Sequence, residues 1–357
     1  TRTLFTERLE QLLLFGNVQL TPPALFLLLR EGVDTVFLRR DGRYMGRLAD
    51  KEPANIFLRK KQFALAEDTA FRTRTARRIV QGKLLNQATV LARIKRSRGQ
   101  EAAGNAAREL RLLADKAEQA HDVESLRGLE GSGAACYFRY LPLAFNQEWG
   151  FSRRVRRPPT DPVNAVLSLL YTLLINRCCA AIRIAGLDPY PACLHTAAYG
   201  RQSLPLDLVE EFRAMLADTL TISLFNMRML HKEDFETPLP ETDPDDLEKN
   251  DELDAVLRDP IGLMTPENAV PDVSDLPGEQ LDTPPSDAPS PGKRPVLLRK
   301  EAFRKVLAAF SKKMETEFFH PAAERHMSYA DALVFQARLY RRLIEGEVEE
   351  YRPLMLR

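Results

Sequence analysis

The sequence predicts an α+β protein, with a small N-terminal β-rich domain at residues 1–60 followed by a larger all-α domain. The β-rich part is predicted by "TVFLRRDGRYMG", in which Asp41-Gly42 separates two strand-like runs and so indicates a hairpin. The all-α part is predicted because long segments from about Lys61 onward have helical character. A chain of 357 residues is long enough for two domains.

The N-terminal domain contains one predicted helix before the hairpin. Thr21, Pro22 and Pro23 favour a helix start, and Gly32 favours its end. We therefore expect one short helix beside the strands of a compact β-rich module.

The first part of the helical domain, residues 61–235, opens with a strongly basic segment. Residues 71–100 contain nine basic side chains and no acidic one, and "WGFSRRVRRPP" is a second basic run. A solvated helix face is one interpretation of such a segment. The other is a surface that binds phosphates.

A long apolar helix follows the second basic run. Asp161 can cap it and Pro162 can begin it, and its apolar residues surround most of its circumference, so we expect a central core helix. Polar residues interrupt it too often for a membrane span, and they recur at every fourth position: Asn164, Ser168, Thr172 and Asn176. This stripe either packs against other helices through hydrogen bonds or faces a site.

Residues 236–292 are expected to form an acidic, proline-rich mobile insert. They hold 11 of the 24 prolines and few aromatic residues, a composition that cannot bury enough apolar surface to offset the entropy of ordering. Helical patterns return in "KEAFRKVLAAFSKKMETEFF" and "SYADALVFQARLYRRLIEGEVEEY". Residues 293–357 are therefore predicted to complete the helical domain.

The net charge of +1 conceals a basic body. Residues 233–292 contain 18 acidic and two basic side chains, and the rest of the chain contains 49 basic and 32 acidic ones. A basic body indicates polyanionic partners such as nucleic acid. The four cysteines show no CxxC spacing, which argues against a disulfide framework or a zinc site and favours a reducing, cytoplasmic location. No apolar run reaches the ~20 residues needed to span a bilayer, so no membrane is expected.

Carboxylates and one histidine form the candidate site. Ser203 and Pro205 can start a helix on which Asp207, Glu210 and Glu211 share the face opposite an apolar stripe. Each residue also has a simpler interpretation. The acidic group can be a solvated first helical turn, and His195 can be a structural histidine. Glu130, before the small-residue run at 131–135, can be an exposed glutamate beside closely packed helices.

Three segments carry a resemblance: "GLEGSGAACYF", "RRPPTDPVNAVLSLLYTLL" and "GLDPYPACLHTAAYGRQSLPLDLVEEFR". Together they resemble the signature segments of the CRISPR adaptation integrase family, the first of the numbered CRISPR-associated proteins. "LFGNVQLT", "RRDGRYMGR" and "YRPLMLR" match in the same order, so the resemblance covers nearly the whole chain outside the insert. Family members usually have additional strands before "LFGNVQLT", so we expect the chain to be trimmed or cut from a longer fusion at its β-rich dimerisation domain.

The resemblance implies a metal-dependent DNA endonuclease and integrase whose helical domain is catalytic. Glu130, His195 and Glu210 would bind Mn²⁺ or Mg²⁺, Asp207 would be a further catalytic acid, and Asn164 and Tyr171 would support the site. The implied partners are double-stranded DNA, as spacer precursor and CRISPR repeat, and a second copy of the chain. Two such dimers would be bridged by a dimer of the small ferredoxin-like second CRISPR-associated protein in a heterohexamer.

The chemistry of these residue types agrees with that role. One imidazole and two carboxylates suit Mn²⁺, tolerate Mg²⁺ and leave coordination positions for water and phosphate oxygens. The attacking group would be a DNA 3′-hydroxyl, so no protein nucleophile is needed. The residues expected to hold DNA phosphates are basic: Arg72, Arg74, Arg77, Arg78, Lys83, Arg153, Arg154, Arg156 and Arg157.

Three alternatives remain at the level of sequence. Cys193 and His195 could form a nucleophile pair, although no orienting group is evident. A transposon-encoded integrase of the same superfamily would share the chemistry. A helical DNA-binding scaffold without activity would need none of the three proposed ligands.

Overall fold

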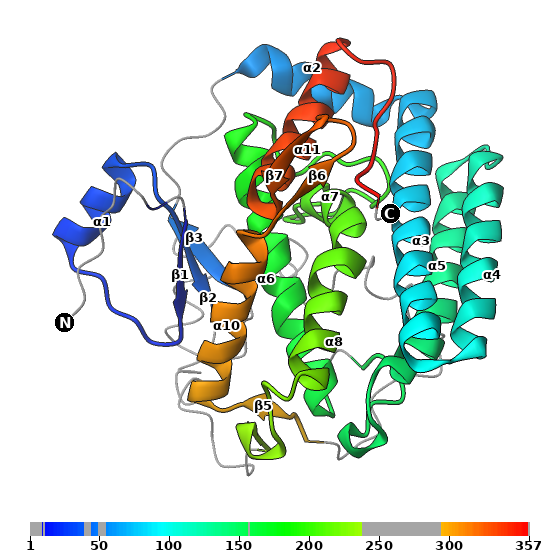
Figure 1. The fold of residues 1–357 in the computed structure, drawn as a ribbon. Helices are drawn as coiled ribbons and strands as arrows, with labels where there is room; N and C mark the ends of the chain where they lie inside the picture. The colour runs from blue at the N-terminus through cyan, green and yellow to red at the C-terminus, as the bar shows by residue number, and fades with distance from the viewer. Residues whose placement is uncertain are drawn as a thin grey trace.

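The computed structural model describes residue 9 and residues 11–38, 44–48, 55–155, 158–237 and 294–355. An α+β architecture is present, as predicted (Figure 1). The predicted insert at 236–292 lies almost wholly outside the described residues, as do Arg156, Arg157 and the Asp41-Gly42 turn.

The N-terminal unit is a three-stranded sheet with one helix. It consists of β1 (Gln11–Phe15), α1 (Pro22–Arg30), β2 (Asp34–Leu38) and β3 (Tyr44–Leu48). β2 lies between β1, which is parallel to it, and β3, which is antiparallel, so the predicted hairpin is confirmed. α1 begins after Thr21, and Gly32 adopts a φ of 65° just after its end, as its sequence signals predict.

Four helices follow, and the first of them begins before residue 61. They are α2 (Ile56–Glu67), α3 (Thr69–Arg98), α4 (Glu101–Glu118) and α5 (Val123–Tyr140). Asp68 and Asp122 cap α3 and α5 by accepting backbone N–H bonds, and Gly99 ends α3 with a φ of 66°. α3, α4 and α5 pack side by side along one flank of the molecule (Figure 1).

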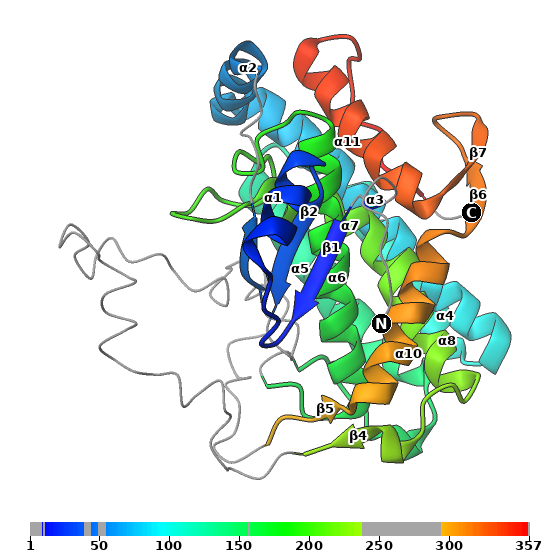
Figure 2. The same ribbon diagram turned by 90° about the vertical axis from the view of Figure 1, so that its left-hand side faces the viewer.

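The predicted central core helix is α6 (Pro162–Ile184), which begins at Pro162 with Asp161 as its cap. Two 3₁₀ turns precede it, η2 (Leu141–Ala144) and η3 (Gln147–Trp149). The N-terminal sheet lies against one side of α6, with α1 on the outer side of the sheet and α3, α4 and α5 on the far side of α6 (Figure 1; Figure 2 gives a second view). By length and composition α6 could cross a membrane, but 72% of its most apolar stretch is buried inside the protein, which is typical of a core helix.

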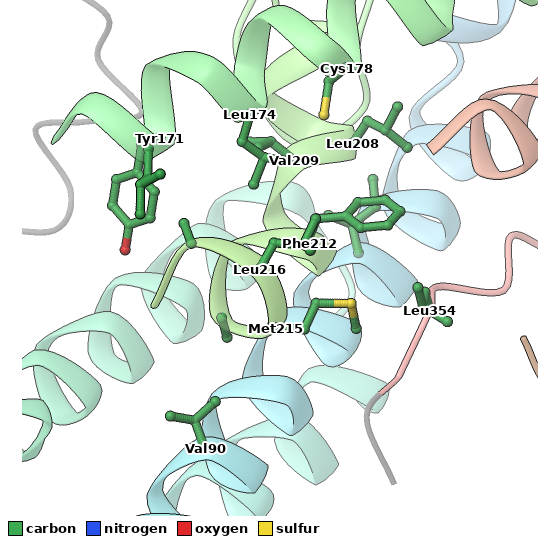
Figure 3. Close-up of a cluster of buried hydrophobic side chains, with 14 of the residues drawn as sticks. Val90, Tyr171, Leu174, Cys178, Leu208, Val209, Phe212, Met215, Leu216 and Leu354 are labelled. Atoms are coloured by element: carbon green, nitrogen blue, oxygen red, sulfur yellow. The ribbon is translucent and has the colours of Figure 1, made fainter. Parts of the chain in front are cut away.

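The next helical segment changes its geometry part-way along. α7 (Leu204–Phe212) continues into a π-helical segment, η4 (Arg213–Asp218), and then into α8 (Thr219–Asn226). In Figure 3, Leu208, Val209 and Phe212 of α7 lie near Leu174 of α6, within the main core. π-Helical turns of this kind are frequent at functional sites.

Further strands and helices follow the residues of the predicted insert. A 3₁₀ turn, η5 (Lys232–Asp234), leads into β4 (Phe235–Glu236), which pairs antiparallel with β5 (Leu297–Leu298) on the far side of the insert. The remaining elements are α10 (Lys300–Met314), the hairpin β6 (Glu317–His320) and β7 (Arg325–Ser328), and α11 (Tyr329–Glu345). These two small strand pairs are the only departures from an all-α domain among its described residues.

Candidate active site

Three helices bring two carboxylates to one lysine. Glu130 on α5 and Glu210 on α7 are only 7% and 3% exposed, and Lys83 on α3 is 3% exposed. The Lys83 ammonium contacts Oε1 of Glu130 and lies 2.7 Å from Oε2 of Glu210. The two carboxylates therefore share one cation in the protein interior.

Glu210 has a second cationic partner from its own helical segment. Arg213 Nη1 donates to Glu210 Oε1 at 3.0 Å, and the Arg213 guanidinium lies 4.7 Å from the ring centre of Tyr171. Tyr171 donates in turn to Asp218 at 2.6 Å. The carboxylate of Glu210 is thus fixed by hydrogen bonds and by stacking on α6.

His195 is held by Asp207 through both its backbone and its ring. The carboxylate of Asp207 accepts from the backbone N–H groups of Cys193, Leu194 and His195 at 2.7, 2.9 and 3.0 Å. The His195 Nδ1 atom lies 2.6 Å from Asp207 Oδ1. Because a carboxylate accepts hydrogen bonds, Nδ1 carries the proton, and the lone pair of the neutral ring is on Nε2.

The structure does not bring the three predicted ligands into one cluster. Across the described part of the chain, no group of three or more His, Cys, Asp or Glu side chains is arranged to hold a metal ion. Glu130 and Glu210 instead meet at Lys83, and His195 is paired separately with Asp207.

The residue types nevertheless fit a divalent ion. Two buried carboxylates that already share a cation supply oxygen ligands of the kind that Mn²⁺ and Mg²⁺ accept. A histidine whose Nδ1 is bound to a carboxylate has the orientation commonly found in metal-ligating histidines. Glu130, Glu210 and His195 could hold such an ion once the Lys83 ammonium moves away from the carboxylates.

The acidic face predicted as a possible solvated turn is buried. Asp207, Glu210 and Glu211 are 1%, 3% and 2% exposed, so the interpretation as a solvated first turn is wrong. Helix α7 packs against α3 and α6, and the C-terminal segment contacts Glu211, so the helix has almost no exposed side.

Glu211 anchors the C-terminal segment instead of facing the site. Its carboxylate accepts from the Tyr351 hydroxyl, the Leu354 backbone N–H and, at 2.9 Å, Gln336 Nε2. Burial raises the pKa of Glu211 to about 8, although these donors act in the opposite direction. The segment that matched as "YRPLMLR" is thereby fixed against the helix that carries Glu210.

The simpler interpretation of Glu130 as an exposed residue is also wrong, but the close packing expected beside it is present. Glu130 is buried, and a Cβ at Gly133 on the same helix would collide with the buried Leu84 of α3. The glycine lets α3 and α5 approach closely enough for Lys83 to reach Glu130.

The polar stripe on α6 mainly makes structural hydrogen bonds. Asn164 accepts from Arg154 and from the Val155 backbone, each at 2.9 Å, and Ser168 accepts from Arg154 at 3.1 Å. Arg154 stacks over Tyr171 at 5.4 Å. Asn164 thus lies away from the carboxylates and reaches them only through a chain of contacts, whereas Tyr171 contacts Arg213 directly.

The predicted DNA-binding residues are dispersed in the structure. Arg74 and Arg153 are exposed and Arg72 is half-buried. Arg77 donates to the Ala120 carbonyl at 2.7 Å, and Arg78 pairs with Glu118 and Glu350.

Two of the predicted DNA-binding residues are buried. Lys83 and Arg154 are 3% and 5% exposed, so they do not lie on an outer surface where they could track a DNA backbone. Their cationic groups are bound to the protein's own carboxylate, carbonyl and hydroxyl oxygens.

The alternative of a Cys–His nucleophile pair is not supported by the geometry. The Nδ1 atom of His195 faces Asp207, while the Cys193 sulfur lies 3.3 Å from the Tyr340 hydroxyl. Burial raises the pKa of the Cys193 thiol to about 12, so the thiolate needed for attack is scarce. All four cysteines are free and buried.

Three cationic side chains lie beside the candidate site. Lys83 and Arg213 contact the carboxylates, and Arg127 on α5 donates to the Leu194 carbonyl next to His195. Sequence analysis assigns Lys83 to DNA binding and does not single out the two arginines. Arg213 follows Glu210 by three residues, and Arg127 precedes Glu130 by three, so helical spacing was an available signal for both.

Comparison with known proteins identifies the family. Residues 1–241 match the family model described as CRISPR associated protein Cas1. The chain belongs to the Cas1 family. CRISPR-associated endonuclease Cas1 3 of Thermus thermophilus is 33% identical over 348 residues, covering 98% of this chain and 86% of the relative. CRISPR-associated endonuclease Cas1 1 of Moorella thermoacetica is 32% identical over 356 residues, covering 98% and 88%.

Solved structures show that the fold is that of Cas1. A Cas1 protein from Thermotoga maritima has a TM-score of 0.70 at 21% identity, covering 96% of this chain and 88% of that one. A casposase bound to integration product has a TM-score of 0.73 at 19% identity, covering 96% and 81%. A chain of a Cas6-RT-Cas1–Cas2 complex has a TM-score of 0.72 at 22% identity, and this protein spans 32% of that longer chain.

Proposed function

We propose that this Cas1 protein is a metal-dependent DNA endonuclease and integrase that inserts spacer DNA into a CRISPR array. The reaction is a transesterification in which the 3′-hydroxyl of the incoming DNA attacks a phosphodiester of the target strand. A new phosphodiester bond forms, the bond from phosphorus to the target strand's own 3′-oxygen breaks, and that oxygen leaves as a 3′-hydroxyl. The observation that carries the proposal is the pair of buried carboxylates, Glu130 and Glu210, sharing one cation within a Cas1 fold. The curated relatives named as endonucleases support it.

The protein's part in this chemistry is to hold ligands and exclude water. Glu130 and Glu210 provide two buried negative charges. His195 provides a ring nitrogen, and its hydrogen bond to Asp207 fixes the orientation of the ring. A bound Mn²⁺ or Mg²⁺ ion supplies charge neutralisation at the phosphate and activation of the attacking hydroxyl. Arg213, stacked on Tyr171, keeps the Glu210 carboxylate in place.

We also propose the partners and location of the working particle. The DNA partners are a double-stranded spacer precursor and the CRISPR repeat, and the chain acts as a homodimer in the cytoplasm. Two dimers join a dimer of the small second CRISPR-associated protein in a heterohexamer. A structural neighbour from a Cas6-RT-Cas1–Cas2 complex supports this partner.

A casposase-like integrase of a transposon is the second candidate. The similarity to a casposase bound to integration product favours it, and it would use the same carboxylates and histidine. Target choice separates the two candidates, because only the CRISPR integrase should prefer a plasmid that carries the cognate repeat.

Alanine variants test the proposed catalytic residues. We expect Glu130→Ala, His195→Ala and Glu210→Ala each to abolish Mn²⁺-dependent cleavage and integration while circular dichroism shows an intact fold. Glu301→Ala is the matched control, because the Glu301 side chain is 75% exposed on α10. Wild-type activity in the His195→Ala protein would refute the assignment, and absence of cleavage and integration in the wild type itself would favour the non-catalytic scaffold.

A further inference from the structure

We propose that Arg127 is a positioning residue that sets the orientation of the His195 imidazole. The inference rests on the proposed function, because it matters for catalysis only if His195 is a metal ligand. It assigns a role to a side chain that lies on the same helix as Glu130 but outside the acidic and histidine set.

The geometry is a clamp on one peptide group. Arg127 donates from Nε and Nη2 to the Leu194 carbonyl oxygen, at 2.8 and 2.6 Å. The same peptide group continues into the His195 N–H, which donates to Asp207 Oδ1 at 3.0 Å. The peptide that immediately precedes the imidazole is therefore held on its carbonyl side by α5 and on its amide side by α7.

The clamp joins the two separate halves of the site. Arg127 is one helical turn before Glu130 on α5, and Asp207 is one turn before Glu210 on α7. A movement of either helix relative to the 193–195 loop must move a carboxylate and strain a hydrogen bond to that loop. Arg127 and Asp207 thus keep His195 in register with both carboxylates.

The contacts of Arg127 favour positioning over phosphate binding. Two of its nitrogens are used by the Leu194 carbonyl, and the third, Nη1, contacts Glu124. The Arg127 side chain is 12% exposed, whereas the Glu124 side chain is 80% exposed. The ion pair between them therefore contributes little net stabilisation. A planar guanidinium holds a carbonyl through two nitrogens, and a lysine supplies only a single donor group.

Two measurements test the role without relying on activity. The first is NMR of ¹⁵N-histidine-labelled, metal-free protein at one fixed pH, in which the five histidines give few signals and His195→Gln identifies those of His195. The second is Mn²⁺ affinity from electron paramagnetic resonance. The variants are Arg127→Met, which keeps an unbranched side chain without donors, and Arg127→Lys, which keeps the charge.

We expect Arg127→Met to shift or broaden the ring signals of His195 and of no other histidine. We also expect it to weaken Mn²⁺ binding about 10-fold, which is the smallest loss of affinity typical when a residue that orients a metal ligand is removed. Arg127→Lys should lie between Arg127→Met and the wild type. Arg341→Met is the matched control, because Arg341 also donates to a backbone carbonyl, that of Ala185 at 3.3 Å, but lies on α11. It should leave both measurements unchanged.

The outcomes separate the inference from the proposed function. Unchanged His195 signals and unchanged Mn²⁺ affinity in folded Arg127→Met would overturn the positioning role. If that variant does not fold, the lysine variant decides by the same two measurements. If the wild type binds no Mn²⁺, the proposed metal site fails, and the His195 signals of metal-free protein still decide what Arg127 does.

Discussion

Replacement of Asp218 by asparagine should remove a pH-dependent part of the stability. Asp218 is 2% exposed at the end of the π-helical segment. Its carboxylate accepts from the hydroxyls of Tyr137 and Tyr171 at 2.8 and 2.6 Å. Burial raises its pKa from 3.8 to about 6, although the two tyrosines and Arg213 act in the opposite direction.

The sign and size of the effect follow from this shift. Because the folded pKa lies above the unfolded one, the folded state binds the proton more tightly. The contribution is complete below the unfolded pKa of 3.8 and is lost as pH rises through the folded pKa of about 6. A difference of about two pKa units corresponds to about 3 kcal/mol of unfolding free energy.

The measurement is urea unfolding of wild type and Asp218→Asn at several pH values between 4 and 7. The unfolding free energy of the wild type should fall by about 2–3 kcal/mol relative to the variant across this range. Glu211 titrates in both proteins, so its effect cancels in the difference. As a control, Asp122→Asn removes a carboxyl whose pKa is lowered from 3.8 by the backbone hydrogen bond of Ser125. Its contribution to stability changes mainly below pH 3.8, so the difference between the wild type and this variant should stay nearly constant from pH 4 to 7. A wild-type-minus-Asp218→Asn difference that is constant with pH would refute the reasoning.

Three further predictions concern packing, charge and the insert. Gly82→Ala should destabilise the protein by about 1–3 kcal/mol in urea unfolding, because the new Cβ would lie 2.6 Å from Pro353 Cβ. Gly128→Ala should stabilise it by up to about 1 kcal/mol, because its new Cβ would have no atom within 4 Å. Changes of the same sign in both variants would contradict this. Lys83→Met should lower the unfolding free energy of the metal-free protein by about 3–5 kcal/mol, because two buried carboxylates lose their shared cation. Added Mn²⁺ should restore much of that free energy. If Mn²⁺ restored none of it, this would count against a metal site shared by the two carboxylates. Replacing residues 238–291 with a short Gly-Ser bridge should leave the melting temperature nearly unchanged. The same change should tighten non-specific DNA binding at low salt only. A large drop in melting temperature would show that the insert is a docked, folded element.

The elements with strong local signals could be predicted from the sequence. The cap and proline at Asp161 and Pro162 mark the start of α6, and the hairpin between β2 and β3 lies where Asp41-Gly42 indicates it. Both of these features depend on neighbouring residues alone. The β4–β5 pair differs from them, because it joins residues on the two sides of the insert.

The environment of the carboxylates could not be predicted because it depends on long-range packing. Lys83 precedes Glu130 by 47 residues in the sequence. The close approach of α3 to α5 at Gly133 brings the two side chains together. Helical periodicity assigned α7 one buried and one solvated face. That rule failed at Glu211, because the C-terminal segment, far away in sequence, covers the second face.

Strand transfer tests the central claim most directly. Wild-type protein with Mn²⁺ would be mixed with a labelled DNA ending in a 3′-hydroxyl and a plasmid carrying the cognate repeat, beside the same DNA ending in a 3′-deoxy sugar. The account predicts label joined to the plasmid with the 3′-hydroxyl end alone, and none with Glu130→Ala or Glu210→Ala. Joining of the 3′-deoxy end, or undiminished joining by both variants, would contradict it.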